Sequence, residues 1–567
     1  MGGPMPSRSQ KILERPEFSL NRCAYKAMGY SDEDLKRPII GIANSWNDLC
    51  PGHYNLRQLA EFVRKGIHRA GGTAAEFGTI ACCDATPQGH IGMHFVLPSR
   101  DIIAHSIEIM VEAHQLDAIV LLGSCDKIVP GMLMAAARLG IPAILLPGGP
   151  MLGGVEFDNR PSDMTSASEA VGMLAKGLIR PEQLDLLEDQ CVPSCGSCSF
   201  LGTANTMCCL SEAMGMTLPD GALTPAPYAD RLRLGEATGT AIVNLAHKNI
   251  TARDIITRDA LCNAVRVAMA IGGSTNAFLH LSAIAFELGI SGDDMMHIYE
   301  ELSDATPHVA KVNPSSKYNM EHFHQSGGVP RVMKEIRPLL NLSCMTVDGV
   351  SLGERLDKHV ERYPVNRAVI ATMAEPFSSS RGLAILRGNL APRTAVTKPA
   401  AIDASMWTFT GKAVVFDCEE DANAAILAGR IVENDVVVIR YEGPRGGPGM
   451  REMYKSMKYM HGMGLALKTA LVTDGRFSGT NNGCFVGHVS PEAAAGGPLA
   501  IVRDGDRITI DIPNRSLHLH LSDAAIASRL KEWKAPTPKF TRGYLGIYSR
   551  LASSADQGAV LHMPQPA

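Results

Sequence analysis

Short apolar runs alternate with helical patterns over the first two-thirds of the chain, which is typical of a parallel α/β sheet. Pro38 to Ala43 predicts a buried strand, and Leu56 to Arg69 has the spacing of an amphipathic helix. Residues 117–122 and 141–146 predict two more strands of the same sheet. The segment Gly123-Ser124-Cys125-Asp126-Lys127 follows the first of them, at the carboxyl end where open α/β sheets place their ligands.

The pattern changes from about residue 383 onward, where glycine-rich, strand-like runs replace the long helical stretches. Residues 507–521 alternate apolar and polar side chains around a Pro-Asn pair, which predicts a β-hairpin. The last dozen residues are expected to form a loose tail. We predict a large N-terminal parallel-sheet α/β domain over residues 1–378 and a smaller, β-rich, barrel-like domain over residues 379–567. Further strands of the second domain are expected at Val414–Phe416, Asp435–Arg440 and Ala470–Thr473.

Composition narrows the class of protein. With 567 residues the chain is too long for one hydrophobic core, which supports two or more domains. Its net charge of −4 offers no basic surface to nucleic acid. The N-terminal residues lack the apolar core of a signal peptide, and no apolar run is long enough to span a bilayer. We expect a cytoplasmic globular protein with neither a nucleic-acid nor a membrane partner.

The chain contains fourteen cysteines, and in a large cytosolic protein these do not predict a disulfide framework. Most are expected to be small buried apolar side chains, as free cysteines usually are. This group comprises Cys23, Cys208, Cys209, Cys262, Cys344, Cys418 and Cys484.

Two cysteine motifs carry more chemistry. Cys125-Asp126-Lys127 combines a thiolate, which suits iron or zinc, with a carboxylate, which suits magnesium or manganese. Taken alone, this tripeptide is also compatible with a buried cysteine beside a surface ion pair. Residues 191–198 contain three further cysteines, Cys191, Cys195 and Cys198. A redox pair or half of a zinc site would use the same spacing, but no partner motif at zinc-site spacing follows.

Two glycine-rich turns follow predicted strands of the second domain. Ser478 lies in Thr473-Asp-Gly-Arg-Phe-Ser-Gly-Thr480, directly after the strand at 470–473, so its hydroxyl is expected to be exposed beside backbone amides. No G-x-S-x-G hydrolase motif is present here. The loop at 443–452 lacks the GK[ST] ending of a phosphate-binding loop, so a nucleotide site is not expected.

Several long motifs together resemble one known family. They are CDKxxPGMLMAAARL, AIGGSTN, LRGNLAP, YEGPRGGPGM, TDGRFSG and GHVSPEAAAGGPLA, and they occur in order between about residues 125 and 500. The chain is similar to the dihydroxy-acid dehydratases, whose family also includes phosphogluconate and pentonate dehydratases. The resemblance implies a hydro-lyase that removes water from a 2,3-dihydroxy carboxylic acid to form a 2-keto acid.

The resemblance also implies two inorganic cofactors. Family members hold an iron–sulfur cluster with three cysteines, so that one iron stays open as a Lewis acid for the leaving hydroxyl. Cys125 and Cys198 match two of these ligands by motif. A magnesium ion would be held by Asp84, Asp126, Glu452 and a carbamylated Lys127. Ser478, as an alkoxide, would remove the proton from C2, and Thr480 is the expected substrate-binding residue of the same loop.

Two departures from the family pattern concern the site. Members with a 2Fe-2S cluster usually carry T-P-C where this chain has Cys50-Pro51-Gly52, so the expected cysteine position is Gly52. We assign Cys50 as the third cluster ligand, with Cys195 as the next candidate. The 2Fe-2S type is favoured, and 4Fe-4S is the alternative. The second departure is Cys83-Asp-Ala-Thr-Pro87, where branched-chain members usually have D-G-I-x-M.

The motifs leave the substrate open between two classes. TDGRFSG, GHVSPEA and DIPNR resemble the branched-chain enzyme that acts on 2,3-dihydroxyisovalerate, whereas LRGNLAP and SGT resemble the sugar-acid dehydratases. We favour the branched-chain substrate with tolerance for sugar acids. A hypothesis of a different class is a non-catalytic iron–sulfur or zinc protein that acts as a sensor or scaffold. The resemblance also implies a homodimer or homotetramer.

Overall fold

Four buried strands form the N-terminal sheet in the order β2-β1-β3-β4. All neighbouring pairs are parallel, as the uninterrupted aliphatic runs predicted. The three strands expected between residues 38 and 146 are therefore confirmed. The computed structural model describes residues 7–379, 382–480 and 483–562. It bounds these strands as β1 (Ile39–Asn44), β2 (Thr73–Gly78), β3 (Ala118–Leu122) and β4 (Ala143–Leu146).

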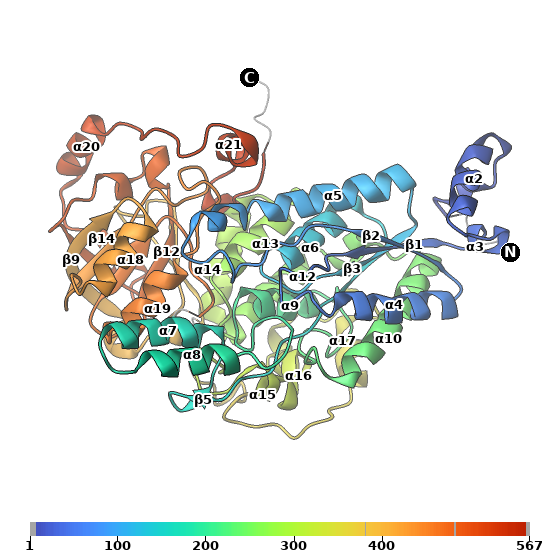
Figure 1. The fold of residues 1–567 in the computed structure, drawn as a ribbon, viewed down its shortest axis with the longest axis horizontal. Helices are drawn as coiled ribbons and strands as arrows, with labels where there is room; N and C mark the ends of the chain where they lie inside the picture. Colours follow the sequence, from blue (N-terminus) through green and yellow to red (C-terminus); the bar gives the residue numbers. More distant parts are fainter. Residues whose placement is uncertain (1–6, 380–381, 481–482, 563–567) are drawn as a thin grey trace.

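Helices cover both faces of this sheet (Figure 1). Helices α4 and α10 pack together on one face, and α5 and α6 pack on the other. The α4–α10 crossing is close because Gly66 and Gly239 face each other, and a Cβ on Gly239 would lie 2.1 Å from the carbonyl oxygen of Val63. The helix predicted over Leu56 to Arg69 is confirmed. These helices are α4 (Leu56–Arg69), α5 (Ser99–His114), α6 (Ile128–Leu139) and α10 (Ala229–Lys248).

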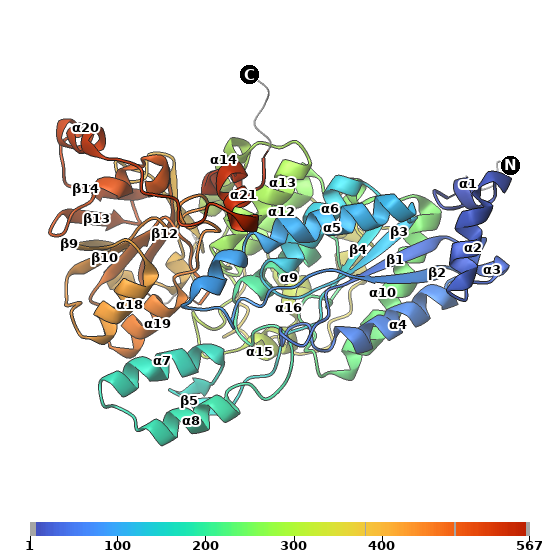
Figure 2. The ribbon, with the colours of Figure 1, turned by 45° about the horizontal axis from the view of Figure 1, so that its top comes forward.

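Helices supply most of the remaining N-terminal structure, and they surround the sheet and extend away from it (Figures 1 and 2). Short helices α1 to α3 precede β1 and lie at one end of the N-terminal region (Figure 1). Leu13 and Leu35 pack into its core, and Ser9 donates hydrogen bonds to Asp117. The bounds are α1 (Gln10–Leu13), α2 (Ser19–Ala27), α3 (Asp32–Leu35), β5 (Glu156–Phe157), β6 (Arg160–Pro161), α7 (Met164–Ala175), α8 (Pro181–Gln190), α9 (Thr203–Ala213), α11 (Ala252–Ile255), α12 (Arg258–Ala270), α13 (Asn276–Glu287), α14 (Gly292–Ala305), α15 (Met320–Gln325), α16 (Gly328–Glu335) and α17 (Leu352–Lys358).

The C-terminal region forms an eight-stranded sheet in the order β14-β13-β9-β10-β11-β12-β8-β7. Its four central strands, β9 to β12, are parallel, and the outer pairs are antiparallel. The predicted strands and the hairpin at 507–521 are confirmed. The bounds are β7 (Ala384–Leu386), β8 (Thr394–Thr397), β9 (Thr408–Phe416), α18 (Glu419–Leu427), β10 (Asp435–Ile439), α19 (Tyr454–Gly462), β11 (Ala470–Thr473), β12 (Cys484–Ser490), β13 (Arg507–Asp511), β14 (Ser516–Leu519), α20 (Asp523–Glu532) and α21 (Gly543–Leu551).

The two edges of this sheet meet and nearly close it into a barrel. The amide of Arg387, just after β7, donates to the carbonyl of Arg515 over 2.9 Å, and the amide of Leu517 in β14 donates back to the carbonyl of Arg387. Closure satisfies backbone groups that an open sheet would leave at its edges. The predicted fold class, a parallel-sheet α/β region followed by a barrel-like β region, is confirmed.

The two regions are joined by a buried ion pair between helices. Helix α7 of the N-terminal region lies beside α19 of the barrel in both views. Gly172 and Gly462 allow this approach, because a Cβ on Gly172 would lie 2.9 Å from the Cα of Gly462. At the same contact, the ammonium of Lys458 lies 2.9 Å from the carboxylate of Glu169. Both side chains are at most 4% exposed, so the pair is largely shielded from water.

Two expectations from the sequence are wrong. The chain end is not a loose tail up to residue 562, because Asp556 is buried and pairs with Arg393 over 2.6 Å. The carbonyl of Ala559 also accepts hydrogen bonds from Arg100 and Tyr548, which anchors this segment. Cys23 is exposed rather than buried. Helix α2, which carries it, buries none of its residues, so there is no interior for that thiol to enter.

Among the described helices, none has both the length and the apolar character needed to cross a membrane.

Candidate active site

The predicted cysteines and acids of the N-terminal region lie after successive parallel strands. Cys50 is in the loop after β1, Asp84 is in the loop after β2, and residues 125–127 connect β3 to α6. Because parallel strands end at the same edge of a sheet, these loops converge. Cys198 joins them from the loop that precedes α9.

The barrel contributes the second half of the site in the same way. Glu452 ends the loop after β10, and Ser478 lies in the loop after the neighbouring strand β11. The two loops pair with each other through a short parallel bridge between Glu452 and Arg476. The carboxyl ends of parallel strands in two separate sheets therefore face one another.

Three carboxylates meet where the two regions join. Oxygen atoms of Asp84, Asp126 and Glu452 all lie within 4.8 Å of one another. Burial and the charge of Asp126 raise the pKa of Asp84 well above its usual value. Gln88 donates to one oxygen of Glu452 over 3.2 Å, and Arg476 forms an ion pair with the other. Such a group of carboxylates is a ready site for a hard divalent cation.

Lys127 lies against these acids and is fully buried. Its ammonium is 3.2 Å from a carboxylate oxygen of Asp126. Burial and the neighbouring Arg476 lower the pKa of Lys127. Burial also lowers the pKa of His488 to about 3, with Arg476 and Lys127 adding to this effect, so the imidazole is neutral. His280 is likewise held neutral by burial and by the charge of Lys127.

Four thiols gather on the sheet side of the carboxylates. The sulfur atoms of Cys50 and Cys125 are 3.4 Å apart, and Cys83 is in hydrogen-bond contact with Cys50. A hydrogen bond with Cys50 favours the Cys125 thiolate, but burial and nearby negative groups raise the pKa of Cys125 to about 12. Those groups include Asp84 and Cys198. Thiols placed so close together disfavour one another's ionisation unless a metal holds them.

His53 completes a set with Cys50 and Cys125 whose ligand atoms lie within 4.8 Å of one another, but its nitrogens are occupied. Its Nε2 accepts hydrogen bonds from the backbone amides of Ser124 and Cys125, at 3.2 and 3.1 Å. Its Nδ1 therefore carries the proton and donates to the carbonyl of Ser45. Burial lowers the pKa of His53 to about 4. We interpret His53 as the residue that fixes the Cys125 turn rather than as a metal ligand.

One cavity of about 250 Å³ opens onto both groups. Ser478, only 7% exposed, lies in its wall with Cys198 and the three carboxylates. The first turn of α9 borders the cavity at Gly202 and Thr203. The remaining lining residues are Ala85, Thr86, Gln88, Met164, Ser168, Phe200, Tyr454 and Lys455.

Five residues predicted from the sequence do not line this cavity: Cys50, Cys125, Lys127, Thr480 and Cys195. Thr480 is buried, and its carbonyl accepts a hydrogen bond from Lys458. Cys195 is half-buried in the loop before α9, and burial raises the pKa of its thiol. Its role as an alternative cluster ligand gains no support from its surroundings.

Sequence reasoning missed Cys83, Gln88 and Arg476. Cys83 was noted as a change in the pocket wall and not as a thiol of the metal site. Its position directly before Asp84 was the available signal, because a loop that brings Asp84 to the site also brings its neighbour. Arg476 had a similar signal, since it lies two residues before Ser478 in a predicted turn.

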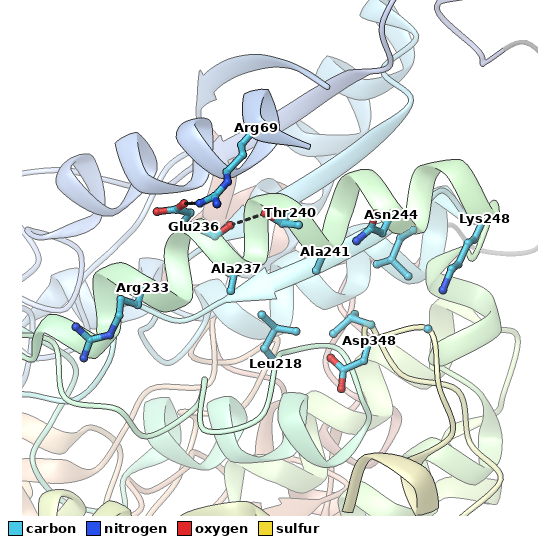
Figure 3. A pocket seen from close by; sticks show the side chains of 13 residues that line it. Arg69, Leu218, Arg233, Glu236, Ala237, Thr240, Ala241, Asn244, Lys248 and Asp348 are labelled. Carbon is cyan, nitrogen blue, oxygen red and sulfur yellow. Dashed lines mark hydrogen bonds and ion pairs between the residues drawn. The ribbon is translucent and has the colours of Figure 1, made fainter. Parts of the chain in front are cut away.

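A larger cavity, of about 600 Å³, lies away from this site between α10 and the loops near Leu218 and Asp348 (Figure 3). Its centre is aliphatic, and its charged side chains lie toward the edges. Arg69 is paired with Glu236 over 2.7 Å. None of the site residues predicted from the sequence lines this cavity.

Comparison with known proteins agrees with this arrangement. Residues 37–355 match the family model for the N-terminal part of dihydroxy-acid/6-phosphogluconate dehydratases, and residues 368–559 match that for the C-terminal part. A protein of Caldanaerobacter subterraneus subsp. tengcongensis named dihydroxy-acid dehydratase is 49% identical over 98% of this chain and 99% of its own. Proteins with the same name from Acetivibrio thermocellus and Ignicoccus hospitalis are each 48% identical, over 98% and 97% of this chain and 99% of their own lengths.

The fold and the site are those of a hydro-lyase with a metal-binding centre. The chain belongs to the dihydroxy-acid/6-phosphogluconate dehydratase family. The resemblance and the enzyme class predicted from the motifs are confirmed.

The position of His53 leads to a prediction. His53→Ala removes the acceptor of two buried amides, which costs about 1–3 kcal/mol for each group left unpaired. We expect the metal-loaded variant to unfold at a lower temperature than the parent while the EPR spectrum of its reduced iron centre stays unchanged. His68→Ala, at an exposed position on α4, is the control. A changed EPR spectrum with unchanged thermal stability would instead identify His53 as an iron ligand.

Proposed function

We propose that the chain is a dihydroxy-acid dehydratase that converts a 2,3-dihydroxy carboxylate to a 2-keto acid. One observation carries this proposal: Ser478, three carboxylates and Cys198 line a single cavity. The chemistry needs a base, a site for a cation and a site for a Lewis acid around one small substrate. A non-catalytic sensor or scaffold would not need this combination, and family membership argues against it.

A magnesium ion fits the carboxylate group. Asp84, Asp126 and Glu452 supply hard oxygen ligands, the type that magnesium prefers. Burial and the charge of Asp126 raise the pKa of Asp84, and a cation at the centre would counter both effects by favouring the carboxylate. Gln88 and Arg476 orient Glu452 from behind.

A carbamylated Lys127 is the fourth ligand in this proposal. Carbon dioxide adds to a neutral amine, and burial lowers the pKa of Lys127 toward that form. Among the described residues, His280 and His488 each have a buried Nε2 without a hydrogen-bond partner, and the charge of Lys127 lowers the pKa of both imidazoles. These nitrogens are suitable partners for the added carboxylate group, which would otherwise be costly to bury.

The thiols suit an iron–sulfur cluster with Cys125, Cys198 and Cys50 as ligands. Cys50 is the preferred third ligand because its sulfur lies 3.4 Å from that of Cys125. A side chain at position 52 would not fit in this arrangement, because a Cβ on Gly52 would lie 2.3 Å from the Cys125 sulfur. We favour a 2Fe-2S cluster, with 4Fe-4S as the alternative. Cys83 is the main alternative to Cys50 as the third cluster ligand, because the two thiols are in contact.

The reaction follows from the placement of these groups. When bound, the cluster supplies a Lewis acid for the C3 hydroxyl, and the cation neutralises the substrate carboxylate and acidifies the C2 proton. Ser478 takes that proton, and hydroxide leaves from C3. The enol that results tautomerises to the 2-keto acid.

The cavity wall bears on the substrate class. Met164, Phe200 and Tyr454 provide apolar surface for a short branched tail, which favours 2,3-dihydroxyisovalerate. Ser168 and Lys455 lie in the same wall and could contact additional hydroxyl groups. They are the specific reason to keep sugar acids, the pentonates and gluconate, as the second candidate.

The quaternary structure and location remain predictions. We propose a homodimer or homotetramer in the cytoplasm, on the family resemblance alone.

Ser478→Ala tests the proposed function directly. We expect the variant to keep its visible cluster absorbance and its bound magnesium, because Ser478 ligates neither in this account. Its kcat for 2-keto acid formation should fall by a factor of about 10²–10⁴, which is the usual contribution of a positioned base. The assay compares dihydroxyisovalerate with gluconate and the pentonates for both proteins.

Preference for dihydroxyisovalerate is the expected result for the parent enzyme. A higher kcat/KM with a pentonate would favour the sugar-acid alternative. Full turnover by Ser478→Ala would remove Ser478 as the base.

A series of cysteine variants tests the third cluster ligand. We expect Cys50→Ser to lose iron, whereas Cys83→Ser and Cys195→Ser should keep it, as measured by iron content and visible absorbance. Cys23→Ser, at an exposed position on α2, is the control. If Cys83→Ser loses iron and Cys50→Ser keeps it, the ligand is Cys83. If only Cys195→Ser loses iron, the ligand is Cys195.

A further inference from the structure

Three buried side chains donate hydrogen bonds to the backbone of the loop that carries Ser478. We call residues 477–480 the serine loop. Three of its four backbone carbonyls accept a hydrogen bond from a side chain that is at most 1% exposed. The pairs are Asn276 Nδ2 to Phe477 O at 3.1 Å, Lys398 Nζ to Gly479 O at 2.9 Å, and Lys458 Nζ to Thr480 O at 3.0 Å.

The three donors come from distant parts of the chain. Asn276 is the first residue of α13, Lys398 directly follows β8, and Lys458 lies within α19. The N-terminal region and two separate elements of the barrel therefore all bind the backbone of the serine loop. A loop restrained at three carbonyls has little freedom to reorient, so the position of the Ser478 side chain depends on these donors.

The two lysines differ in their electrostatic surroundings. Lys458 also forms the buried ion pair with Glu169 at 2.9 Å. Lys398 has no carboxylate within 4.0 Å among the described residues of the chain. Burial lowers the pKa of Lys398 to about 7, and the positive charge of Lys458 is a smaller contribution to this decrease. Its other titratable neighbour is His308, which burial and Lys398 hold neutral, with a pKa of about 4.

A buried ammonium without a counter-ion destabilises a fold unless negative charge develops beside it. In the proposed reaction the oxygen of Ser478 gains negative charge, and Ser478 is the residue next to Gly479, whose carbonyl accepts a hydrogen bond from Lys398. The hydrogen bond to the Gly479 carbonyl keeps the Lys398 ammonium next to the serine loop. Lys398 therefore lies where it can act on Ser478 without touching the substrate, because it is not part of the cavity wall.

Gly479 is closely packed. It lies against the residues that precede α9, where a Cβ on Gly479 would be 2.8 Å from the Cα of Gly202. The loop is therefore restrained both by the hydrogen bond from Lys398 and by contact with the start of α9. A shorter or uncharged side chain at position 398 would leave the Gly479 carbonyl buried without its donor.

We propose that Lys398 is a positioning residue for Ser478: it fixes the serine loop through the Gly479 carbonyl, and its uncompensated charge favours the alkoxide form of the serine. This inference rests on the proposed role of Ser478 as the base. It assigns to Lys398 an electrostatic part in the reaction that differs from the structural part of Lys458, whose charge is already balanced by Glu169.

The test uses the metal-loaded enzyme and the variants Lys398→Met and Lys398→Arg. For Lys398→Met we expect kcat to fall about 10- to 100-fold, as for removal of one preorganised electrostatic group, with KM changed by no more than about twofold. The primary isotope effect on kcat for substrate deuterated at C2 should increase, because proton abstraction becomes slower. The ascending limb of the kcat–pH profile, where Ser478 loses its proton, should move to higher pH, since loss of a cation raises the pKa of a neighbouring hydroxyl.

Lys398→Arg retains the charge and a donor, so it should recover part of kcat and restore the parent pH profile. It also keeps the proposal testable if Lys398→Met does not fold. Lys468→Met, at an exposed position before β11, is the control and should match the parent in every measurement. Iron content and visible absorbance, recorded for each variant, separate an effect on the base from loss of the cluster.

Two results would overturn the proposal. One is a Lys398→Met enzyme with unchanged kcat, isotope effect and pH profile. The other is a loss of activity that accompanies loss of iron and that Lys398→Arg does not reverse. Ser478→Ala is measured in parallel: if it retains turnover, the base assignment itself fails. If Ser478→Ala is inactive and Lys398→Met is normal, only the inference about Lys398 fails.

Discussion

Asp84, Asp126 and Glu452 bring three carboxylates within 4.8 Å of one another in the wall of one cavity, where like charges repel strongly. Two buried cations reduce that repulsion. Arg476 pairs with Glu452, and Lys127 lies 3.2 Å from Asp126. Burial, together with the charge of Asp126, still raises the pKa of Asp84. The proposed divalent cation would bind all three acids at once, and most features of the site can be understood from it.

The architecture explains how the acids come together from two folds. Both the N-terminal sheet and the central part of the barrel are parallel, so each directs the loops after its strands to one edge. The two edges face each other, with the buried ion pair of Glu169 and Lys458 beside them. Lys458 also holds the serine loop. The contact that joins the two regions is therefore continuous with the support of the proposed base.

Much of this arrangement could be predicted from the sequence because it depends on local signals. Aliphatic runs of four to six residues identified the parallel strands, and the cysteine, acid and serine motifs lay directly after them. Contacts made by unremarkable residues could not be predicted in the same way. Lys398 follows an ordinary short strand, and nothing nearby in the sequence indicates that it meets the serine loop 81 positions later.

Other errors arose where composition was used in place of packing. The last residues have the polarity of a tail, but Asp556 finds Arg393 and Ser490 on the barrel and is buried by them. Cys23 is exposed because helix α2, which carries it, buries none of its residues. Cys83 lies beside Cys50 because the loop that positions Asp84 also positions its neighbour, a signal that the sequence analysis did not use.

The central claim is that thiols and carboxylates of this chain form two adjacent metal sites, one for iron and one for a hard divalent cation. The most direct measurement is anomalous X-ray diffraction from crystals of the iron-loaded enzyme with Mn²⁺ in place of Mg²⁺, recorded at the iron and manganese edges. The account predicts iron signal beside Cys125 and Cys198 and a separate manganese signal among Asp84, Asp126 and Glu452. Iron bound among the carboxylates, or no manganese at that position, would contradict it.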